Sequence, residues 1–223
     1  MNFADSYTEP NTQTSKPKVY FPIYDEIFYK KDFNRLDKHT VLEIGVDTGF
    51  GTKALKTYFP NSDIYGLDIN EDCKKFGENG IQVIIGSQVD DVILNQLNEI
   101  NFDIVIDDGS HHNDHVTHTF NALFGSLKPG GLYIIEDTHT SYWPYYGGGY
   151  LNKNGTIEKF KSMIDTLHSW CIKHPIACHV PPYLGEKFYY NELHQKWIKS
   201  IKFYESVLVI EKRETESLDK KPW

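Results

Sequence analysis

Two short runs of apolar, mostly β-branched residues, each ending in paired acids, constrain this chain more than any other feature. Residues 104–108 read Ile-Val-Ile-Asp-Asp, and residues 133–137 read Tyr-Ile-Ile-Glu-Asp. In a parallel sheet such runs are buried strands whose carboxyl ends open onto a ligand crevice. The pattern therefore predicts that acids from two separate segments meet at one edge of a sheet, with His111 beside the first pair.

Strand-like runs alternate with helix-like segments along most of the chain. The expected strands are residues 41–46, 63–68, 82–85, 103–107 and 132–135, and the expected helices are residues 52–59, 89–100, 116–127 and 156–173. Residues 198–212 read as two strands joined by a turn, and Tyr20, Tyr24 and Phe28 mark the core face of a short helix. This order predicts an α/β fold: a Rossmann-like, doubly wound, mostly parallel seven-stranded sheet with a C-terminal antiparallel hairpin.

The length of 223 residues favours one main domain, which we expect over residues 19–212. Residues 1–18 are polar and are expected to form a loop or mobile N-terminal arm, which could also close over a ligand. Residues 213–223 are expected to form a charged tail. Residues 138–150 combine six aromatic or histidine side chains with three consecutive glycines. We therefore expect this segment to act as an aromatic lid beside the acids.

The composition excludes several classes of partner and site. The net charge of −8 argues against a nucleic-acid partner, which would need a basic face. The three cysteines are odd in number and lack a C-x-x-C spacing, so neither a disulfide framework nor a cysteine zinc site is expected. Residues 1–18 lack the apolar core of a signal peptide, and no run approaches the ~18 apolar residues of a membrane span. We therefore expect a cytoplasmic protein without a membrane partner, which could form homo-oligomers.

A glycine-rich turn follows the first expected strand and points to a nucleotide cofactor. Gly45 and Gly49 let the backbone approach a ligand closely, and Asp68, at the end of the second strand, can accept both hydroxyls of a ribose. Asp47 lies inside the turn and would repel a pyrophosphate, and Glu43 before it suits a cationic ligand. The charges favour S-adenosylmethionine, with its sulfonium and amino group, over a dinucleotide.

Several motifs together resemble a known family. They are residues 42–46, 66–68, 103–111, 128–131, 135–138 and 142–144. The set resembles the class I S-adenosylmethionine-dependent methyltransferases. Within that class the two acid motifs are similar to the magnesium-dependent macrolide sugar O-methyltransferases of the mycinamicin 2-hydroxyl type. The resemblance covers roughly residues 20–149, which would make residues 19–212 a methyltransferase domain.

The resemblance implies a role for each matching residue. His111 would be the general base and Asp108 a catalytic residue, with Asp108, Glu136 and Asp137 as metal ligands. The residues expected around the cofactor are Glu43, Gly45, Asp47, Gly49, Asp68, Ser87, Gln88 and Asp107. For Asp107 the alternative is a structural role, capping the next helix or orienting Asp108. His139, Tyr142 and Trp143 would line the acceptor pocket, or else pack the loop.

Three carboxylates suit Mg²⁺, with Mn²⁺ or Ca²⁺ as alternatives, and they make a zinc site on His111 and His115 less favoured. His112, His115 and His118 are expected to be solvated or paired rather than ligands. The function expected is metal-dependent methyl transfer from S-adenosylmethionine to a sugar hydroxyl of a nucleotide sugar, a glycan or a glycosylated small molecule. Methylation of a catechol or other phenol is one alternative. A dinucleotide-binding or non-catalytic protein of the same fold is another.

Overall fold

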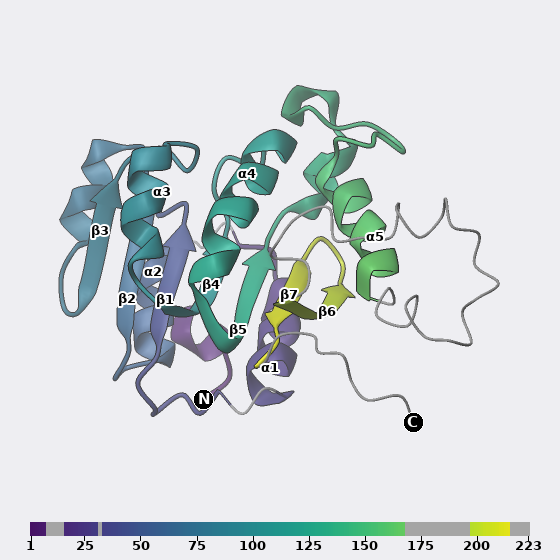
Figure 1. The fold of residues 1–223 in the computed structure, drawn as a ribbon. Coiled ribbons are helices and arrows are strands. Elements are labelled where there is room, and N and C mark those ends of the chain that lie inside the picture. Colours follow the sequence, from purple (N-terminus) through teal and green to yellow (C-terminus); the bar gives the residue numbers. More distant parts are fainter. Residues whose placement is uncertain (8–15, 31–32, 168–196, 215–223) are drawn as a thin grey trace.

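The computed structural model describes residues 1–7, 16–30, 33–167 and 197–214. Their central element is one seven-stranded sheet in the order β3-β2-β1-β4-β5-β7-β6 (Figure 1). The strands are β1 (Thr40–Ile44), β2 (Asp63–Asp68), β3 (Ile81–Ile85), β4 (Phe102–Asp107), β5 (Leu127–Ile135), β6 (Ile198–Phe203) and β7 (Leu208–Lys212). The first five run parallel, and β7 runs antiparallel to both β5 and β6. The expected doubly wound sheet with a C-terminal hairpin is confirmed.

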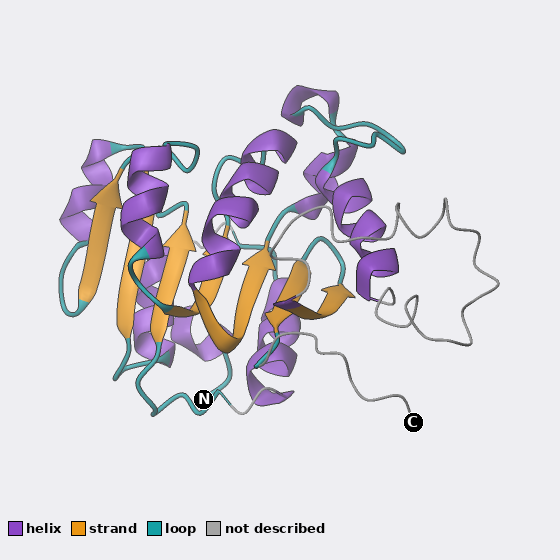
Figure 2. Ribbon diagram, in the orientation of Figure 1, coloured by secondary structure: helices purple, strands orange, loops and turns teal. Residues whose placement is uncertain are grey.

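Helices cover both faces of the sheet, giving three layers (Figure 2). The α-helices are α1 (Tyr20–Lys30), α2 (Phe50–Tyr58), α3 (Asp91–Asn98), α4 (Asn113–Leu123) and α5 (Thr156–Leu167). Short 3₁₀ turns are η1 (Ala4–Tyr7), η2 (Glu71–Phe76), η3 (Phe124–Ser126), η4 (Thr138–Tyr142) and η5 (Pro144–Tyr146). Side chains of α1 and α2 pack in one core cluster, and side chains of α3, α4 and α5 in the other.

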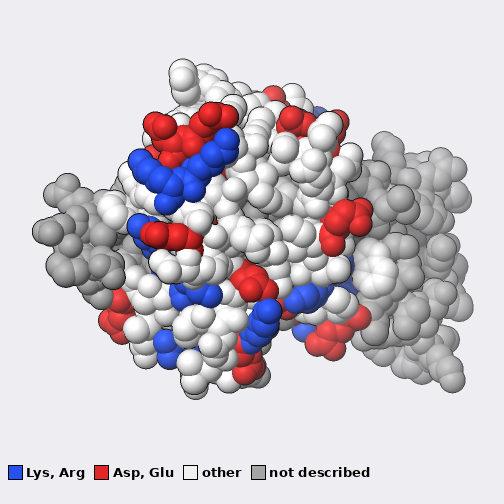
Figure 3. Space-filling model, turned by 90° about the vertical axis from the view of Figure 1, so that its left-hand side faces the viewer, with Lys and Arg blue, Asp and Glu red and all other residues white. Residues whose placement is uncertain are grey.

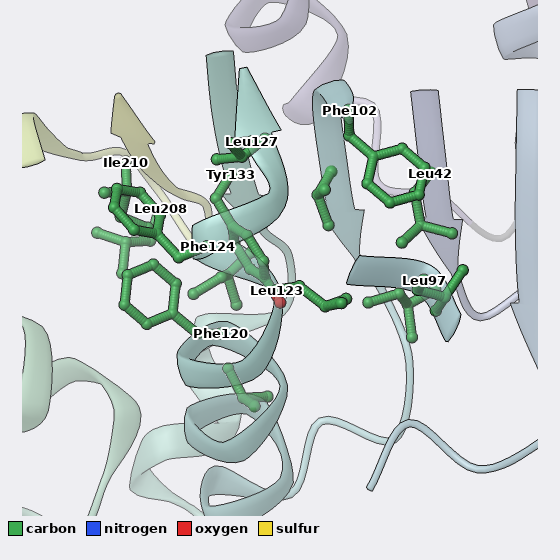
Figure 4. Packing of buried hydrophobic residues seen from close by; sticks show 14 of the residues in the cluster. Leu42, Leu97, Phe102, Phe120, Leu123, Phe124, Leu127, Tyr133, Leu208 and Ile210 are labelled. Carbon is green, nitrogen blue, oxygen red and sulfur yellow. The ribbon is translucent and has the colours of Figure 1, made fainter. Parts of the chain in front are cut away.

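The spacing of apolar residues along the helices explains this layering. On α4, Phe120 and Leu123 lie about one helical turn apart and face Tyr133 and Leu208 of the sheet (Figure 4). Phe120 and Tyr133 meet edge to face, with ring centroids 5.1 Å apart. On the opposite face the Tyr20, Tyr24 and Phe28 stripe is fully buried, which confirms that it belongs to the core.

Several boundaries differ from the expected ones for local reasons. Helix α3 begins at Asp91 because the Asp90 side chain accepts a hydrogen bond from the backbone N–H of Val92. Helix α4 starts three residues earlier than expected and gives way to η3. Strand β5 begins at Leu127, which pairs with Phe102 before the register shifts. Residues 128–131, one of the motifs named above, are therefore part of an irregular strand. Residues 168–173 of the expected last helix lie outside the described residues.

The first seven residues are packed against the domain, whereas a mobile arm was expected there. Phe3 is fully buried and stacks on Tyr24 with ring centroids 4.6 Å apart. Its backbone N–H donates to Asp25. Burying an aromatic ring compensates for the entropy lost on fixing a terminus. Of the expected tail, only residues 213 and 214 lie within the described chain.

Register brings the ends of the central strands to one edge. Ile44 pairs with both Leu67 and Asp107, and Asp107 pairs with Ile135. The loops that follow β1, β2, β4 and β5 therefore leave the sheet at the same level, where parallel sheets bind ligands.

On the face shown in Figure 3, acidic and basic side chains alternate, and no continuous basic area is formed. In the described part of the chain, no helix is both long and apolar enough to cross a membrane.

Candidate active site

A cavity of about 580 Å³ lies at the carboxyl ends of the parallel strands. The loops after β1 to β5 line it, together with Tyr7, Lys16 and Pro17 from the N-terminal segment. This volume is in the usual range for a pocket that holds a small ligand. Six of its lining residues are acids, and Lys16 is the one lysine or arginine among its described lining residues. Its charge favours a ligand that carries positive groups.

The glycine-rich turn is closed against two neighbouring loops. Gly45 has φ +91°, and a Cβ at this position would lie 2.1 Å from the backbone oxygen of Asp108. Asp68 holds the turn from the other side, because its Oδ2 accepts the backbone N–H groups of Val46 and Asp47 at 2.8 and 2.9 Å. The turn is thus fixed where it borders the cavity.

Glu43 is buried at the end of β1 and also lines the cavity. Its Oε2 accepts a hydrogen bond of 2.6 Å from the hydroxyl of Thr52 on α2. Burial raises the pKa of Glu43 to about 8, against the opposing effects of the Lys16 charge and the Thr52 hydrogen bond. The carboxyl would ionise more readily beside a bound cationic group.

Asp107 was expected around the cofactor, but it does not line the cavity. It is fully buried, accepts hydrogen bonds from Gln88 and Tyr133 at 3.2 and 3.1 Å, and has a pKa raised to about 7 by burial. Gln88 in turn accepts the backbone N–H of Ser110 at 2.6 Å. These contacts match the alternative structural role, because they fix the loop that begins with Asp108.

Asp108, Glu136 and Asp137 come together at the other end of the cavity, as the sequence predicts. The ammonium of Lys16 lies 3.1 Å from Oδ2 of Asp108 and 2.5 Å from Oε1 of Glu136. Burial lowers the pKa of Lys16, but the charges of Glu136 and Asp108 outweigh it and raise the pKa well above its ordinary value. A positive charge is therefore stable among these acids.

Two tyrosines of α1 reach the same acids. The Tyr20 hydroxyl donates to Asp137 at 2.5 Å, and the Tyr24 hydroxyl donates to Glu136. Burial raises the pKa of both phenols, so they remain hydrogen-bond donors at neutral pH. The core stripe of α1 thus also supports the acidic centre.

His111 stands beside this centre with Nε2 3.6 Å from Oδ2 of Asp137. Burial lowers its pKa below the ordinary value of 6.5, although Asp137 and Glu136 oppose the shift. The imidazole is therefore neutral near pH 7 and able to accept a proton. One potential ligand atom each from Asp108, His111 and Asp137 lies within 4.8 Å of the other two.

Unusual backbone conformations concentrate at the cavity. Asp47, His111 and Asp137 all line it with positive φ, at 48°, 58° and 54°. Ser206, with φ 62°, accepts or donates a hydrogen bond of 2.5 Å at Nδ1 of His139, which also lines the cavity. Non-glycine residues with positive φ are uncommon and cluster at functional sites.

The segment expected to act as an aromatic lid contains η4 and η5. His139 and Trp143 meet edge to face, with ring centroids 4.8 Å apart, and Tyr146 lies between Trp143 and His112. Tyr142 and Trp143 are about half exposed and do not line the cavity itself. Trp143 contacts His139, which does line the cavity, and the expected place of Tyr142 and Trp143 in the acceptor pocket stays a prediction.

Most of the expected site residues line one cavity. Those that do are Glu43, Gly45, Asp47, Asp68, Ser87, Gln88, Asp108, His111, Glu136, Asp137 and His139. Gly49, Asp107, Tyr142 and Trp143 do not. His115 is paired with Ser110 and His118 with Asp91, as expected for residues that are not ligands, although His115 also borders the cavity. Sequence reasoning missed Tyr7 and Lys16, since a polar N-terminal segment carries no motif that places it here.

The donor set fits both a divalent cation and a sulfonium cofactor. Carboxylates are the ligands that Mg²⁺ prefers, and the Lys16 ammonium already stands in for a cation between Asp108 and Glu136. Asp68 lies across the cavity from these acids. It ends β2, and acids that bind ribose occur at this position in this fold class. The two sites would place a cofactor and a metal in one cavity.

Comparison with known proteins shows close relatives. No protein-family model matches the chain. Demethylmacrocin O-methyltransferase of Streptomyces fradiae is 44% identical over 160 residues, which are 66% of this chain and 40% of that protein. A tetracenomycin rhamnosyl 2′-O-methyltransferase of Streptomyces olivaceus is 41% identical over 139 residues, 58% of this chain and 36% of that protein. The chain spans about two fifths of the length of these relatives.

Among solved structures, the methyltransferase MycE of the mycinamycin biosynthetic pathway, in complex with Mg, S-adenosylhomocysteine and mycinamycin VI, is similar over nearly the whole chain. The TM-score is 0.75 and the identity 31%, covering 99% of this chain and 55% of that one.

Proposed function

We propose that this chain, which is related in sequence and fold to the S-adenosylmethionine-dependent sugar O-methyltransferases, transfers a methyl group from S-adenosylmethionine to a sugar hydroxyl. The observation that carries the proposal is the meeting of Asp108, Glu136, Asp137 and His111 in one acidic cavity with the Asp68 turn. Such a cavity suits a cationic cofactor at one end and a metal-bound hydroxyl at the other.

We propose a glycosylated small molecule as the acceptor. The relatives' names describe O-methylation of demethylmacrocin and 2′-O-methylation of a rhamnosyl tetracenomycin. In this chain Trp143 is half exposed and meets His139, which lines the cavity. Aromatic faces of this kind stack on sugar rings and on apolar aglycones. Nucleotide sugars and free glycans are the competing acceptors for the assay below.

Asp108, Glu136 and Asp137 would hold the metal. A bound divalent cation lowers the pKa of a hydroxyl that it coordinates, which otherwise is close to that of water, ~15.7. Asp68 would bind the ribose hydroxyls of the cofactor, and Glu43 and Asp47 would face its positive groups. These assignments follow from the acidic lining described above.

His111 would accept the proton of the sugar hydroxyl at a nitrogen of its ring. The hydroxyl oxygen then forms a bond to the methyl carbon while the carbon–sulfur bond breaks, and S-adenosylhomocysteine leaves. Asp137, 3.6 Å from Nε2, stabilises the imidazolium that results. Much of the rate would come from holding the oxygen, methyl carbon and sulfur in line.

The test is transfer of a labelled methyl group from S-adenosylmethionine to a panel of glycosylated macrolides, nucleotide sugars and catechols. We expect product only with a glycoside and only when Mg²⁺ or Mn²⁺ is present. Transfer to a catechol alone would replace the sugar assignment with a phenol one. No transfer to any acceptor, from protein that binds the cofactor, would favour a non-catalytic protein of this fold.

A further inference from the structure

We propose that Lys16 is a tethered cation that competes with divalent metal for Asp108 and Glu136, so that metal binding displaces its side chain. The inference rests on the proposed metal site and concerns how this chain controls access to it. It makes Lys16 a residue that sets the metal affinity of the site.

The contacts of Lys16 are those of a bound cation rather than of a surface lysine. Its Nζ donates to both carboxylate oxygens of Glu136, each at 2.5 Å, and to Oδ2 of Asp108 at 3.1 Å. The Lys16 side chain is only 7% exposed, and that of Glu136 only 2%. The ammonium also lies 5.8 Å from the centre of the Tyr24 ring. A lysine desolvated to this degree needs the acids as partners.

Other side chains also contact these acids. Glu136 accepts from Tyr24, and Asp137 accepts from Tyr20 while facing His111. A divalent ion on Asp108 and Glu136 would need the oxygens that Lys16 now holds, and it would lie beside an ammonium of like charge. Repulsion between two cations in a buried site is weakly screened. Lys16 and the metal therefore exclude one another.

The chain around Lys16 allows its side chain to leave without disturbing the helix. The tyrosines of α1 hold Asp137 and Glu136 independently of Lys16. The backbone N–H of Tyr20 bonds to the oxygen of Pro17, which fixes the start of α1 just after Lys16. A lysine side chain has four rotatable bonds and can carry its ammonium several ångströms without backbone movement. Only the ammonium has to move when a metal enters.

The first measurement uses the wild-type chain and has a readout other than activity. Metal-free protein is pulsed with an amine-acetylating reagent, and acetylation of Lys16 is followed by mass spectrometry as Mg²⁺ is added. Exposed Lys18, two residues away, is the internal control, and NaCl of equal ionic strength controls for screening. We expect saturating Mg²⁺ to raise the acetylation rate of Lys16 by about tenfold or more and to leave Lys18 unchanged. Lys16 that stays protected in the Mg²⁺-loaded protein would overturn the proposal.

The second measurement is calorimetric titration of Mn²⁺ into the wild type, Lys16→Met and the control Lys18→Met, which loses the same charge at an exposed position. We expect Lys16→Met to bind about tenfold more tightly and Lys18→Met to match the wild type. Equal affinity in all three would overturn the role of Lys16 while leaving the metal site standing. No binding to any of them would contradict the metal site of the proposed function as well. If Lys16→Met does not fold, Lys16→Gln replaces it and the acetylation result still decides.

Discussion

The hydroxyl of Tyr20 donates a hydrogen bond of 2.5 Å to Oδ1 of Asp137 and so joins the core face of α1 to the acidic centre. Tyr20 is only 1% exposed, whereas Asp137, which accepts its hydrogen bond, lines the cavity. One side chain therefore belongs to the hydrophobic core and to the site. The helix it starts, α1, is positioned by the same contact.

Removing this hydroxyl tests that link. Tyr20→Phe keeps the buried ring and takes one donor from Asp137. We expect the free energy of unfolding to fall by about 1.5–3 kcal/mol, the usual net value of one hydrogen bond to a charged group. Urea denaturation measures it, with Tyr29→Phe as the control, because Tyr29 is 85% exposed. Equal stability of the two variants would argue against a structural role for the contact.

A second prediction concerns the pH dependence of turnover. Burial keeps the pKa of His111 below 6.5, so its neutral, proton-accepting form predominates at pH 7. Turnover should stay constant as pH falls from 8 to about 6.5 and decline only below that value. His111→Asn should lower turnover by ~10²- to 10⁴-fold and leave binding of S-adenosylhomocysteine unchanged. A variant with the wild-type rate would remove the base assignment.

The raised pKa of Glu43 predicts that the stability of the fold depends on pH. Its pKa is about 8 in the native state and close to 4.5 in an unfolded chain, because burial favours the neutral form. The native protein therefore holds a proton that the unfolded chain has lost, and stability present below pH 4.5 declines as pH rises to about 8. The slope is about 1.4 kcal/mol per pH unit at most.

Glu43→Gln should reduce this slope by up to about 1.4 kcal/mol per pH unit, because the raised pKa of Asp107 contributes a slope of the same sign that remains. Glu71→Gln, at an exposed position, should leave the slope unchanged. Chemical denaturation of the cofactor-free proteins at a series of pH values measures the slope. A wild type whose stability does not change between pH 5 and 8 would contradict the prediction.

The glycine turn gives a fourth prediction. A Cβ at Gly45 would meet the backbone oxygen of Asp108 at 2.1 Å, and the φ of +91° is itself strained for alanine. Gly45→Ala should destabilise the fold by several kcal/mol, on the order of 3 or more, since backbone must move. Gly125→Ala is the matched control, because a Cβ there meets nothing within 4 Å. Thermal unfolding distinguishes them, and a similar melting temperature for both would contradict the packing described for the turn.

The fold and the acidic centre could be predicted because their signals are local. Each strand is a short apolar run, and each site acid follows one, so Asp68, Asp108 and Asp137 could be placed at the strand ends. Parallel pairing then brings those ends together without further information. Loop chemistry at Gly45 similarly follows from the residues themselves.

The parts that could not be predicted depend on contacts between distant segments. Lys16 reaches Glu136, 120 residues away, from a segment whose composition indicates only a polar loop. Asp107 and Asp108 are both aspartates. Because successive side chains at the end of β4 point in opposite directions, Asp107 points into the core and Asp108 into the cavity. The burial of Phe3 could not be predicted either, because a single aromatic residue carries no periodicity.

The central claim is that the cavity binds S-adenosylmethionine through the turn held by Asp68. The most direct measurement is calorimetric titration with S-adenosylhomocysteine, with and without Mg²⁺, on the wild type, Asp68→Ala and Asp63→Ala, which changes an acid at the opposite end of β2. We expect the wild type and Asp63→Ala to bind alike and Asp68→Ala to lose about 100-fold in affinity, the order expected for two hydrogen bonds to a charged group. Absence of binding to the wild type under both conditions, or equal binding by Asp68→Ala, would contradict the account.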